Sequence, residues 1–263
     1  MQLKIFQVAA FTERLFGGNP AAVIPLESWL PDELLQNIAA ENNLSETAFL
    51  VPAEDYDWHI RWFTPTVEVP LCGHATLASA AVIDNKLQHP AWPISLRSAS
   101  GLLTVSKVND GYELDFPALQ AAPAEPPAGL ADALGTDFLE CYLARDIFML
   151  ILPDERAVAT LSPDFAALAG LTEHGVIVTA VGDRDDFVSR FFAPSIGIDE
   201  DPVTGAAHCV MVPYWARRLG KSQLLARQIS SRVGVLVCED RGERVGLQGK
   251  ARFFLDGTIS VPD

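Results

Sequence analysis

The sequence predicts an α+β protein built from two similar halves. The segment RWFTPTV at 61–67 matches RFFAPSI at 190–196, with three identical residues in seven and an offset of 190 − 61 = 129, close to half of the 263-residue chain. In both halves a predicted helix and a predicted strand precede this phrase, and a second helix follows it. A repeated order of elements favours duplication over a chance match of one short phrase.

The first half contains two predicted helices among strands. Pro31 followed by Leu34, Leu35 and Ile38 predicts an amphipathic helix within 28–42. The apolar run ETAFLV at 46–51 predicts a strand, and ATLASAAVID from 75 predicts the second helix. The alternating residues of 103–116 predict further strands.

The second half repeats this order. SPDFAALAGL at 162–171 predicts a helix, GVIVTAV at 175–181 a strand, and AAHCVMVPYWARRL from 206 a second helix, before strands over 228–254. The Ala- and Pro-rich segment 121–135 is predicted to link two domains. We expect domains at 1–118 and 119–263, with the last strand free to return to the first domain.

Composition excludes some partners. The formal net charge of −15 disfavours nucleic acid and anionic membranes, both of which require a basic surface. No run reaches the roughly 18–20 apolar residues of a membrane span. Four scattered cysteines without a signal peptide predict a cytoplasmic protein. Neither the cysteines nor the five histidines have metal-binding spacing, and no nucleotide-binding motif appears, so no metal or cofactor is implied.

Two glycine-bearing turns, 72–74 and 204–206, each open a helix. Free backbone N–H groups there favour anions, so Gly73 and Gly205 could bind a carboxylate or stabilise an enolate. Alternatively, these glycines only form tight turns. Asp201 before Pro202 fits an N-cap pointing at the helix start, although the carboxylates of 199–201 could simply complement the helix dipole.

Two titratable residues are candidates for proton transfer. His74 follows Gly73 directly, where an imidazole can shuttle a proton or serve as a structural hydrogen-bonder. Glu46 opens an apolar strand. Partial burial would raise its pKa from about 4.3 towards 6 or 7, as a general acid/base requires. A solvated glutamate at a strand end is the alternative.

Four motifs together resemble the PhzF-like phenazine-biosynthesis isomerase family: GGNPAAV (17–23), NNLSETAFL (42–50), RWFTPTVEVPLCGHAT (61–76) and DEDPVTGAAHC (199–209). The resemblance implies a diaminopimelate-epimerase-like fold. In that fold two similar domains each wrap a curved sheet around a central helix, and the active site lies in the cleft between them. It also implies a small-molecule substrate, no cofactor and a homodimer.

By this resemblance, Glu46 is the acid/base that moves a proton between carbons, His74 assists it, and Asp201 binds the substrate opposite Glu46. Gly73 and Gly205 offer backbone donors. The family commonly has a serine at the position of Ala206, and losing its hydroxyl would leave a substrate group unpaired at about 1–3 kcal/mol. We therefore expect a substrate other than the phenazine precursor.

Three functions follow from these residues. The first is an isomerase that shifts a proton on a small carboxylated metabolite. The second is a two-thiol racemase or epimerase using Cys72 and Cys209, although these cysteines do not occupy equivalent places in the repeat. The third is a metabolite-binding protein without catalysis.

Overall fold

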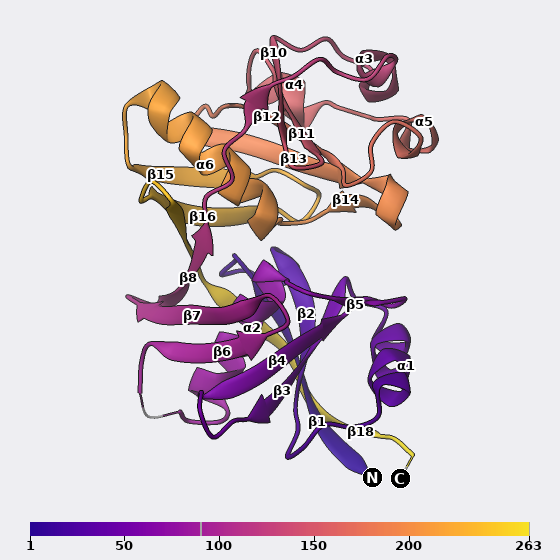
Figure 1. Ribbon diagram of the computed structural model, residues 1–263, viewed down its shortest axis with the longest axis vertical. Coiled ribbons are helices and arrows are strands. Elements are labelled where there is room, and N and C mark those ends of the chain that lie inside the picture. The colour runs from indigo at the N-terminus through magenta and orange to yellow at the C-terminus, as the bar shows by residue number, and fades with distance from the viewer. Residues whose placement is uncertain (90, 263) are drawn as a thin grey trace. The chain divides into compact units, whose positions relative to one another are not determined.

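The computed structural model describes residues 1–89 and 91–262, which divide into two compact units (Figure 1). Unit 1 comprises Met1–Asp115 and the C-terminal segment from Gln248, and unit 2 comprises Phe116–Leu247. The domain boundary predicted from the sequence is at 118/119, and the structure divides the chain at 115/116 and again at 247/248. Each unit is described by itself below.

Unit 1 is a mixed sheet with two helices. Its strands are β1 (Gln2–Ala10), β2 (Asn19–Pro25), β3 (Glu46–Pro52), β4 (Trp58–Phe63), β5 (Glu68–Val69), β6 (Ile94–Ser98), β7 (Gly101–Val108), β8 (Gly111–Pro117) and β18 (Ala251–Ser260). The helices are α1 (Asp32–Asn42) and α2 (Gly73–Asn85). β1 lies between β2 and β18, antiparallel to both.

Helix α2 is the centre of unit 1. Every residue from His74 to Ile83 is buried, and the helix packs against β1, β2, β3 and β18. A helix that is apolar on all sides is stable only inside a core, so the sheet must wrap around it. The small residues Ala75, Ala78 and Ala81 permit this close packing.

Unit 2 contains the longest helix, α6 (Gly205–Leu219). Its short helices are α3 (Leu130–Leu134), α4 (Glu155–Ala159), α5 (Phe165–Ala169) and the 3₁₀ turn Pro194–Ile196. Its strands are β9 (Ala122–Pro123), β10 (Glu140–Ala144), β11 (Ile147–Ile151), β12 (Val176–Val181), β13 (Phe187–Ala193), β14 (Ile198–Asp201), β15 (Gln223–Gln228), β16 (Gly234–Asp240) and β17 (Arg244–Gly249).

The two units repeat one order of pairing. In unit 1, β2 is parallel to β3, β3 antiparallel to β4, and β4 both antiparallel to β5 and parallel to β6. In unit 2, β11, β12, β13, β14 and β15 take the same places with the same directions. Helices α2 and α6 occur at the same point of each repeat. In the chain, α2 lies between the parallel partners β4 and β6, and α6 lies between the parallel partners β13 and β15. The predicted duplication is thus present in the topology.

The repeated arginine-aromatic phrase has one structural role in both units. Arg61 of β4 forms two hydrogen bonds of 2.7 Å with the carboxylate of Glu68 in β5. Arg190 of β13 does the same with Glu200 in β14, at 2.7 and 2.9 Å. Each guanidinium also lies over the phenyl ring two residues further on. The phrase therefore fixes a short strand just before each central helix.

The prediction that 121–135 links two domains is wrong. The segment lies inside unit 2, where β9 pairs with β10 and α3 contributes Leu130, Ala133 and Leu134 to the hydrophobic core. The prolines and glycines of this segment lie instead at the ends of β9 and α3. The chain passes between the units within β8 and returns within β17.

Pro213 inside α6 explains how the segment after β8 is held. Proline has no N–H, so the carbonyl of Cys209, four residues earlier, loses its helical partner. The backbone N–H of Leu119 donates to this carbonyl at 3.0 Å instead.

None of the helices formed by the described residues is long and apolar enough to cross a membrane.

Candidate active site

Glu46 and His74 meet in unit 1. Glu46 is the first residue of β3, and His74 is the second residue of α2. His74 Nε2 lies 3.1 Å from Glu46 Oε2, and the two side chains are only 6% and 13% exposed. These two atoms form no aligned hydrogen bond in the described part of the chain. Catalytic contacts in ligand-free enzymes are often misaligned in this way and tighten when substrate binds.

The turn that precedes Glu46 fixes where its side chain begins. Helix α1 ends at Asn43, whose left-handed backbone (φ 46°) stops the helix. Asn42 Nδ2 then donates to Thr47 Oγ1 at 3.1 Å, which ties the end of α1 to the start of β3. Glu46 is therefore held between a helix cap and a paired strand.

Asn19 holds the other side of the His74 ring. Its Nδ2 lies 3.1 Å from His74 Nδ1, and Asn19 is fully buried at the start of β2. Gly18 makes this possible with φ +62°, because a Cβ there would lie 2.1 Å from the Ala10 carbonyl oxygen. An amide can present either a donor or, turned over, an acceptor, so Asn19 suits both protonation states of the imidazole.

Cys72 is the third group in contact with His74. Its Sγ lies 3.5 Å from Nδ1, and its carbonyl accepts from both the N–H and the Oγ1 of Thr76. Burial and the Glu46 carboxylate raise the pKa of the Cys72 thiol to about 11. Burial lowers the pKa of His74, but its hydrogen bond with Cys72 and the negative charge of the Glu46 carboxylate outweigh burial and raise that pKa well above 6.5. Cys72 is thus a thiol at neutral pH, whereas His74 readily holds a proton.

Glu46, Cys72 and His74 also offer three ligand atoms within 4.8 Å of one another. Cys72 contacts Nδ1 and Glu46 contacts Nε2, on different sides of the ring. A zinc ion bound to one ring nitrogen at about 2.0–2.1 Å would require the partner of the other nitrogen to move. The arrangement as it stands fits a chain of proton carriers better than a metal site.

Asp201 lies in unit 2, where it organises the start of α6. It is buried, and its Oδ2 accepts from Thr204 Oγ1 at 2.5 Å. Fully buried Gln228 donates to the Asp201 carbonyl at 2.8 Å and accepts from the Thr204 N–H at 2.8 Å. The prediction that Asp201 is the N-cap is wrong: Thr204 is the N-cap of α6, and Asp201 is the last residue of β14. Its side chain nevertheless points at the start of the helix, because it accepts a hydrogen bond from the Thr204 hydroxyl. Its role as a substrate-binding group remains a prediction.

The two glycine turns have the expected geometry but different surroundings. Gly73 is half-buried behind the N-cap Cys72, and Gly205 is buried behind the N-cap Thr204. Neither cap side chain accepts a hydrogen bond from the first turn of its helix. Ala206 is exposed at the second position of α6, so a methyl group stands where the family commonly has a hydroxyl.

The structure therefore forms two clusters from the predicted residues. Glu46, Gly73 and His74 belong to unit 1, and Asp201, Gly205 and Ala206 belong to unit 2. In the sequence, Asn19 stands out only as part of the GGNPAAV motif, and Thr204 and Gln228 are not singled out. The signal for Asn19 is the glycine pair before it, because glycine permits the close backbone approach seen at Gly18. Nothing in the sequence marks Gln228.

Comparison with known proteins settles the family. The model of the phenazine biosynthesis-like protein family matches residues 8–257. A protein of Pseudomonas aeruginosa named as an uncharacterized isomerase is 52% identical over 261 residues, which are 99% of this chain and 100% of that protein. This chain belongs to the phenazine biosynthesis-like protein family. Since several relatives are named as isomerases, it is a member of an isomerase family.

Solved structures of the phenazine biosynthesis-like family confirm the fold. A PhzF-family protein from Enterococcus faecalis matches with a TM-score of 0.96 and 47% identity, covering 99% of this chain and 100% of that one. A hydroxyproline epimerase from Agrobacterium vitis shares the fold at a TM-score of 0.62 and 12% identity, over 100% and 93% of the chains. The predicted diaminopimelate-epimerase-like α+β fold is therefore correct.

Proposed function

We propose that this protein is an isomerase that moves a proton between two carbon atoms of a small carboxylated metabolite, without a cofactor. The observation that carries the proposal is the close, poorly aligned contact between the buried Glu46 carboxylate and His74 Nε2. Both groups can carry a proton; His74 lies in the first turn of α2, and Glu46, from β3, contacts it there. Its helix dipole favours the negative charge that develops when a carbon acid loses a proton.

In this proposal Glu46 takes the proton from the substrate carbon and returns it elsewhere. His74 stabilises the negative charge, and Asn19 keeps the imidazole ring in place. The Gly73 N–H is a backbone donor for the substrate carboxylate. Asp201 and the start of α6, with Gly205 and Ala206, are proposed to bind the substrate as well. The protein is further proposed to act in the cytoplasm as a homodimer.

Cys209 gives no support to a two-thiol mechanism. It lies one turn into α6 rather than at the helix start, and burial raises the pKa of its thiol to about 12. The Cys209 thiol would therefore keep its proton at neutral pH and could not act as a base. Cys72 alone cannot serve both faces of a substrate carbon.

Deuterium exchange tests the proposal. Wild type and Glu46→Gln are each incubated with a metabolite extract in heavy water, and mass spectrometry detects metabolites that gain one mass unit. We expect exchange with the wild type and at least a 100-fold loss of exchange in Glu46→Gln, the scale of a general base. Cys72→Ala is the matched control, because it removes a neighbour of His74 but not the acid/base.

Two results would count against the proposal. Exchange retained in Glu46→Gln but lost in Cys72→Ala would favour thiol chemistry. Saturable ligand binding without exchange in any sample would favour a binding protein. Circular dichroism and thermal unfolding of each variant show whether a lost activity reflects a lost fold.

A further inference from the structure

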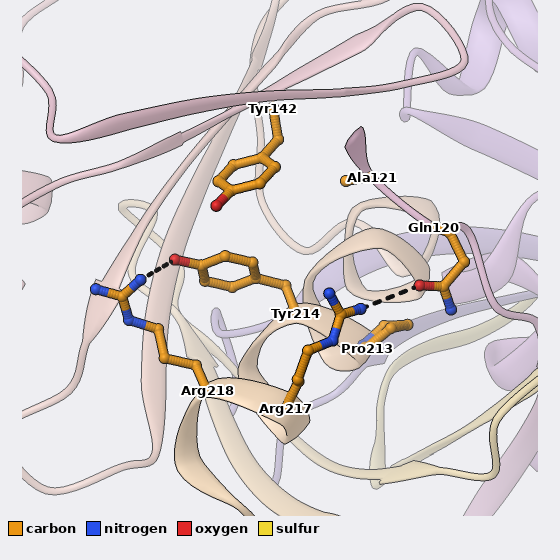
Figure 2. Close-up of a pocket in the computed structure, with 7 residues that line it drawn as sticks. All are labelled: Gln120, Ala121, Tyr142, Pro213, Tyr214, Arg217 and Arg218. Atoms are coloured by element: carbon orange, nitrogen blue, oxygen red, sulfur yellow. Dashed lines mark hydrogen bonds between the residues drawn. The ribbon is translucent and has the colours of Figure 1, made fainter. Parts of the chain in front are cut away.

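Unit 2 contains a pocket of about 250 Å³ beside the C-terminal part of α6 (Figure 2). Tyr142 from β10 and Tyr214 from α6 form one wall, and Gln120 and Ala121 form another. Pro213 and two arginines, Arg217 and Arg218, complete the lining. No step of the proposed isomerisation uses these residues.

The two arginines of the pocket differ in how their charges are used. Arg218 Nη1 donates to Glu140 Oε1 at 2.6 Å and to the Tyr214 hydroxyl at 2.6 Å, so its charge is already neutralised. Arg217 makes one long hydrogen bond of 3.3 Å to Gln120 Oε1 and forms no ion pair with any described residue (Figure 2). The charges of Glu140 and Arg218 cancel, so Arg217 gives this pocket one positive charge that no acidic residue among those described neutralises.

Hydrogen bonds hold the two tyrosines of the wall in place. The rings of Tyr142 and Tyr214 meet edge to face with centroids 5.2 Å apart. Glu140 Oε2 accepts from the Tyr142 hydroxyl at 2.6 Å, while Arg218 holds the Tyr214 hydroxyl. Because both hydroxyls are occupied by this network, the rings offer their apolar surfaces to the pocket rather than their polar ends.

We propose that this pocket is a second ligand site, which binds a small planar anion consisting of one ring and one carboxylate. The carboxylate pairs with the free N–H groups of Arg217, whose planar guanidinium matches a carboxylate with two parallel hydrogen bonds. The ring packs against Tyr142 and Pro213. The volume is slightly below the range typical of drug-sized ligands, which favours a single ring over a larger molecule.

The adjoining hollow supports placing the anion at Arg217. It is lined by Gln120, Pro213 and Arg217 as well, and further along by Lys221 and by the acidic Asp240. Lys221 pairs with Asp186, so Arg217 is again the unneutralised cation where the two hollows meet. The chain carries a net charge of −15, so an arginine without an ion pair to the described residues, where the two hollows meet, is a place where an anion is attracted rather than repelled.

Binding of benzoate tests the proposal, with benzamide as its neutral analogue and acetate as the anion without a ring. The readout is the change in ¹H–¹⁵N chemical shifts of the whole protein, with the amides of Ala121 and Tyr214 as local reporters. We expect benzoate to bind at least tenfold more tightly than benzamide or acetate. Arg217→Gln should weaken benzoate binding at least tenfold, and Arg217→Lys should weaken it less.

Arg156→Gln is the matched control, because Arg156 is an exposed arginine on α4 of the same unit. It should leave benzoate binding unchanged, as should Glu46→Gln, which keeps the proposal independent of the proposed isomerase activity. Equal binding of benzoate and benzamide, or wild-type binding by Arg217→Gln, would overturn it. So would a change of oligomeric state in Arg217→Gln without any effect on benzoate, because the pocket would then serve a protein contact.

Discussion

At the scale of single residues, two histidines near helix starts show how local partners decide protonation. His74 lies between Glu46, Cys72 and Asn19, and its pKa is raised. His208, one turn into α6, has only the Thr204 carbonyl 2.8 Å from Nδ1, and its buried Nε2 has no hydrogen-bond partner among the described residues. Burial therefore lowers the pKa of His208 to about 4.

His208 should make the protein less stable in mild acid. Between its unfolded value of 6.5 and its folded value of about 4, the unfolded chain binds more protons than the folded one. Stability from this residue is therefore complete above pH 6.5 and falls by about 3 kcal/mol as the pH drops to 4. Urea unfolding of wild type and His208→Asn at pH 7 and pH 4.5 measures this difference.

The wild type should lose more stability than His208→Asn over this interval, because only the wild type has the buried imidazole. Protonation of the carboxylates contributes equally to both proteins. His174→Asn is the control, since that histidine is exposed in unit 2. Equal losses in wild type and His208→Asn would contradict the assignment of a neutral, buried imidazole.

Residue identity in the site was predictable where a motif carried it. Glu46 and His74 were named from the sequence, and the structure brings them together. Cys72 was considered as a racemase thiol, and its contact with His74 was not foreseen. Gln228 was invisible to sequence reasoning, because a buried glutamine 24 residues from Thr204 joins the network only after β15 has folded beside α6. Long-range hydrogen bonds leave no local pattern.

At the scale of elements, the duplicated phrase was recognised but its purpose was not. Arg61 and Arg190 were matched by position, and the roles considered for the acidic run 199–201 were an N-cap at Asp201 or complementing the helix dipole. In the structure Glu200 is instead the partner of Arg190, and only Asp201 faces the helix cap. The sequence spacing between the arginine and its glutamate differs between the two halves. The equivalence of Glu68 and Glu200 therefore appears only when the strands are paired.

Removing the two equivalent arginines should have unequal effects. The side chains of Arg190 and Glu200 are 12% and 19% exposed, and Arg190 also donates to the Leu161 carbonyl. Arg190→Gln leaves a largely buried carboxylate unpaired and should cost about 2–4 kcal/mol of unfolding free energy. Arg61 and Glu68 are more exposed, at 23% and 37%, so Arg61→Gln should cost about 1 kcal/mol or less.

Urea unfolding curves of the two variants provide the comparison, and each arginine serves as the control for the other. Both substitutions remove the same contact type from the same point of the repeat. Equal costs would show that burial does not govern the strength of this pair, and a larger cost for Arg61→Gln would contradict the argument.

At the scale of the whole molecule, the order of elements was predictable and the path between the units was not. Local apolar segments predicted both central helices and the strands before them, because α2 and α6 form from apolar residues that are close in the sequence. The inter-unit path depends on which strands pair across long stretches of chain. The Ala- and Pro-rich composition of 121–135 therefore suggested a linker, although its leucines are core residues.

The return of the C-terminal strand to unit 1 has a consequence for stability. β18 pairs with β1 from Gln2↔Ser260 to Ala10↔Ala251, and the Met1 ammonium donates to the Val261 carbonyl at 2.7 Å. The first and last strands of the chain thus lie side by side in unit 1 (Figure 1). Removing residues 251–263 would leave β1 with an unpaired edge and uncover part of α2, which packs against β18.

Because the stability of a whole domain is roughly 5–15 kcal/mol, this deletion should unfold most of unit 1. Hydrogen exchange measured by mass spectrometry should show amides of β1, β2 and α2 exchanging at least 100-fold faster. Peptides from β12 and β13 should keep their protection, because both strands pair within unit 2. A chain ending at Val261 is the control and should exchange like wild type. Uniform loss of protection in both units would show instead that the two units fold only as one cooperative body.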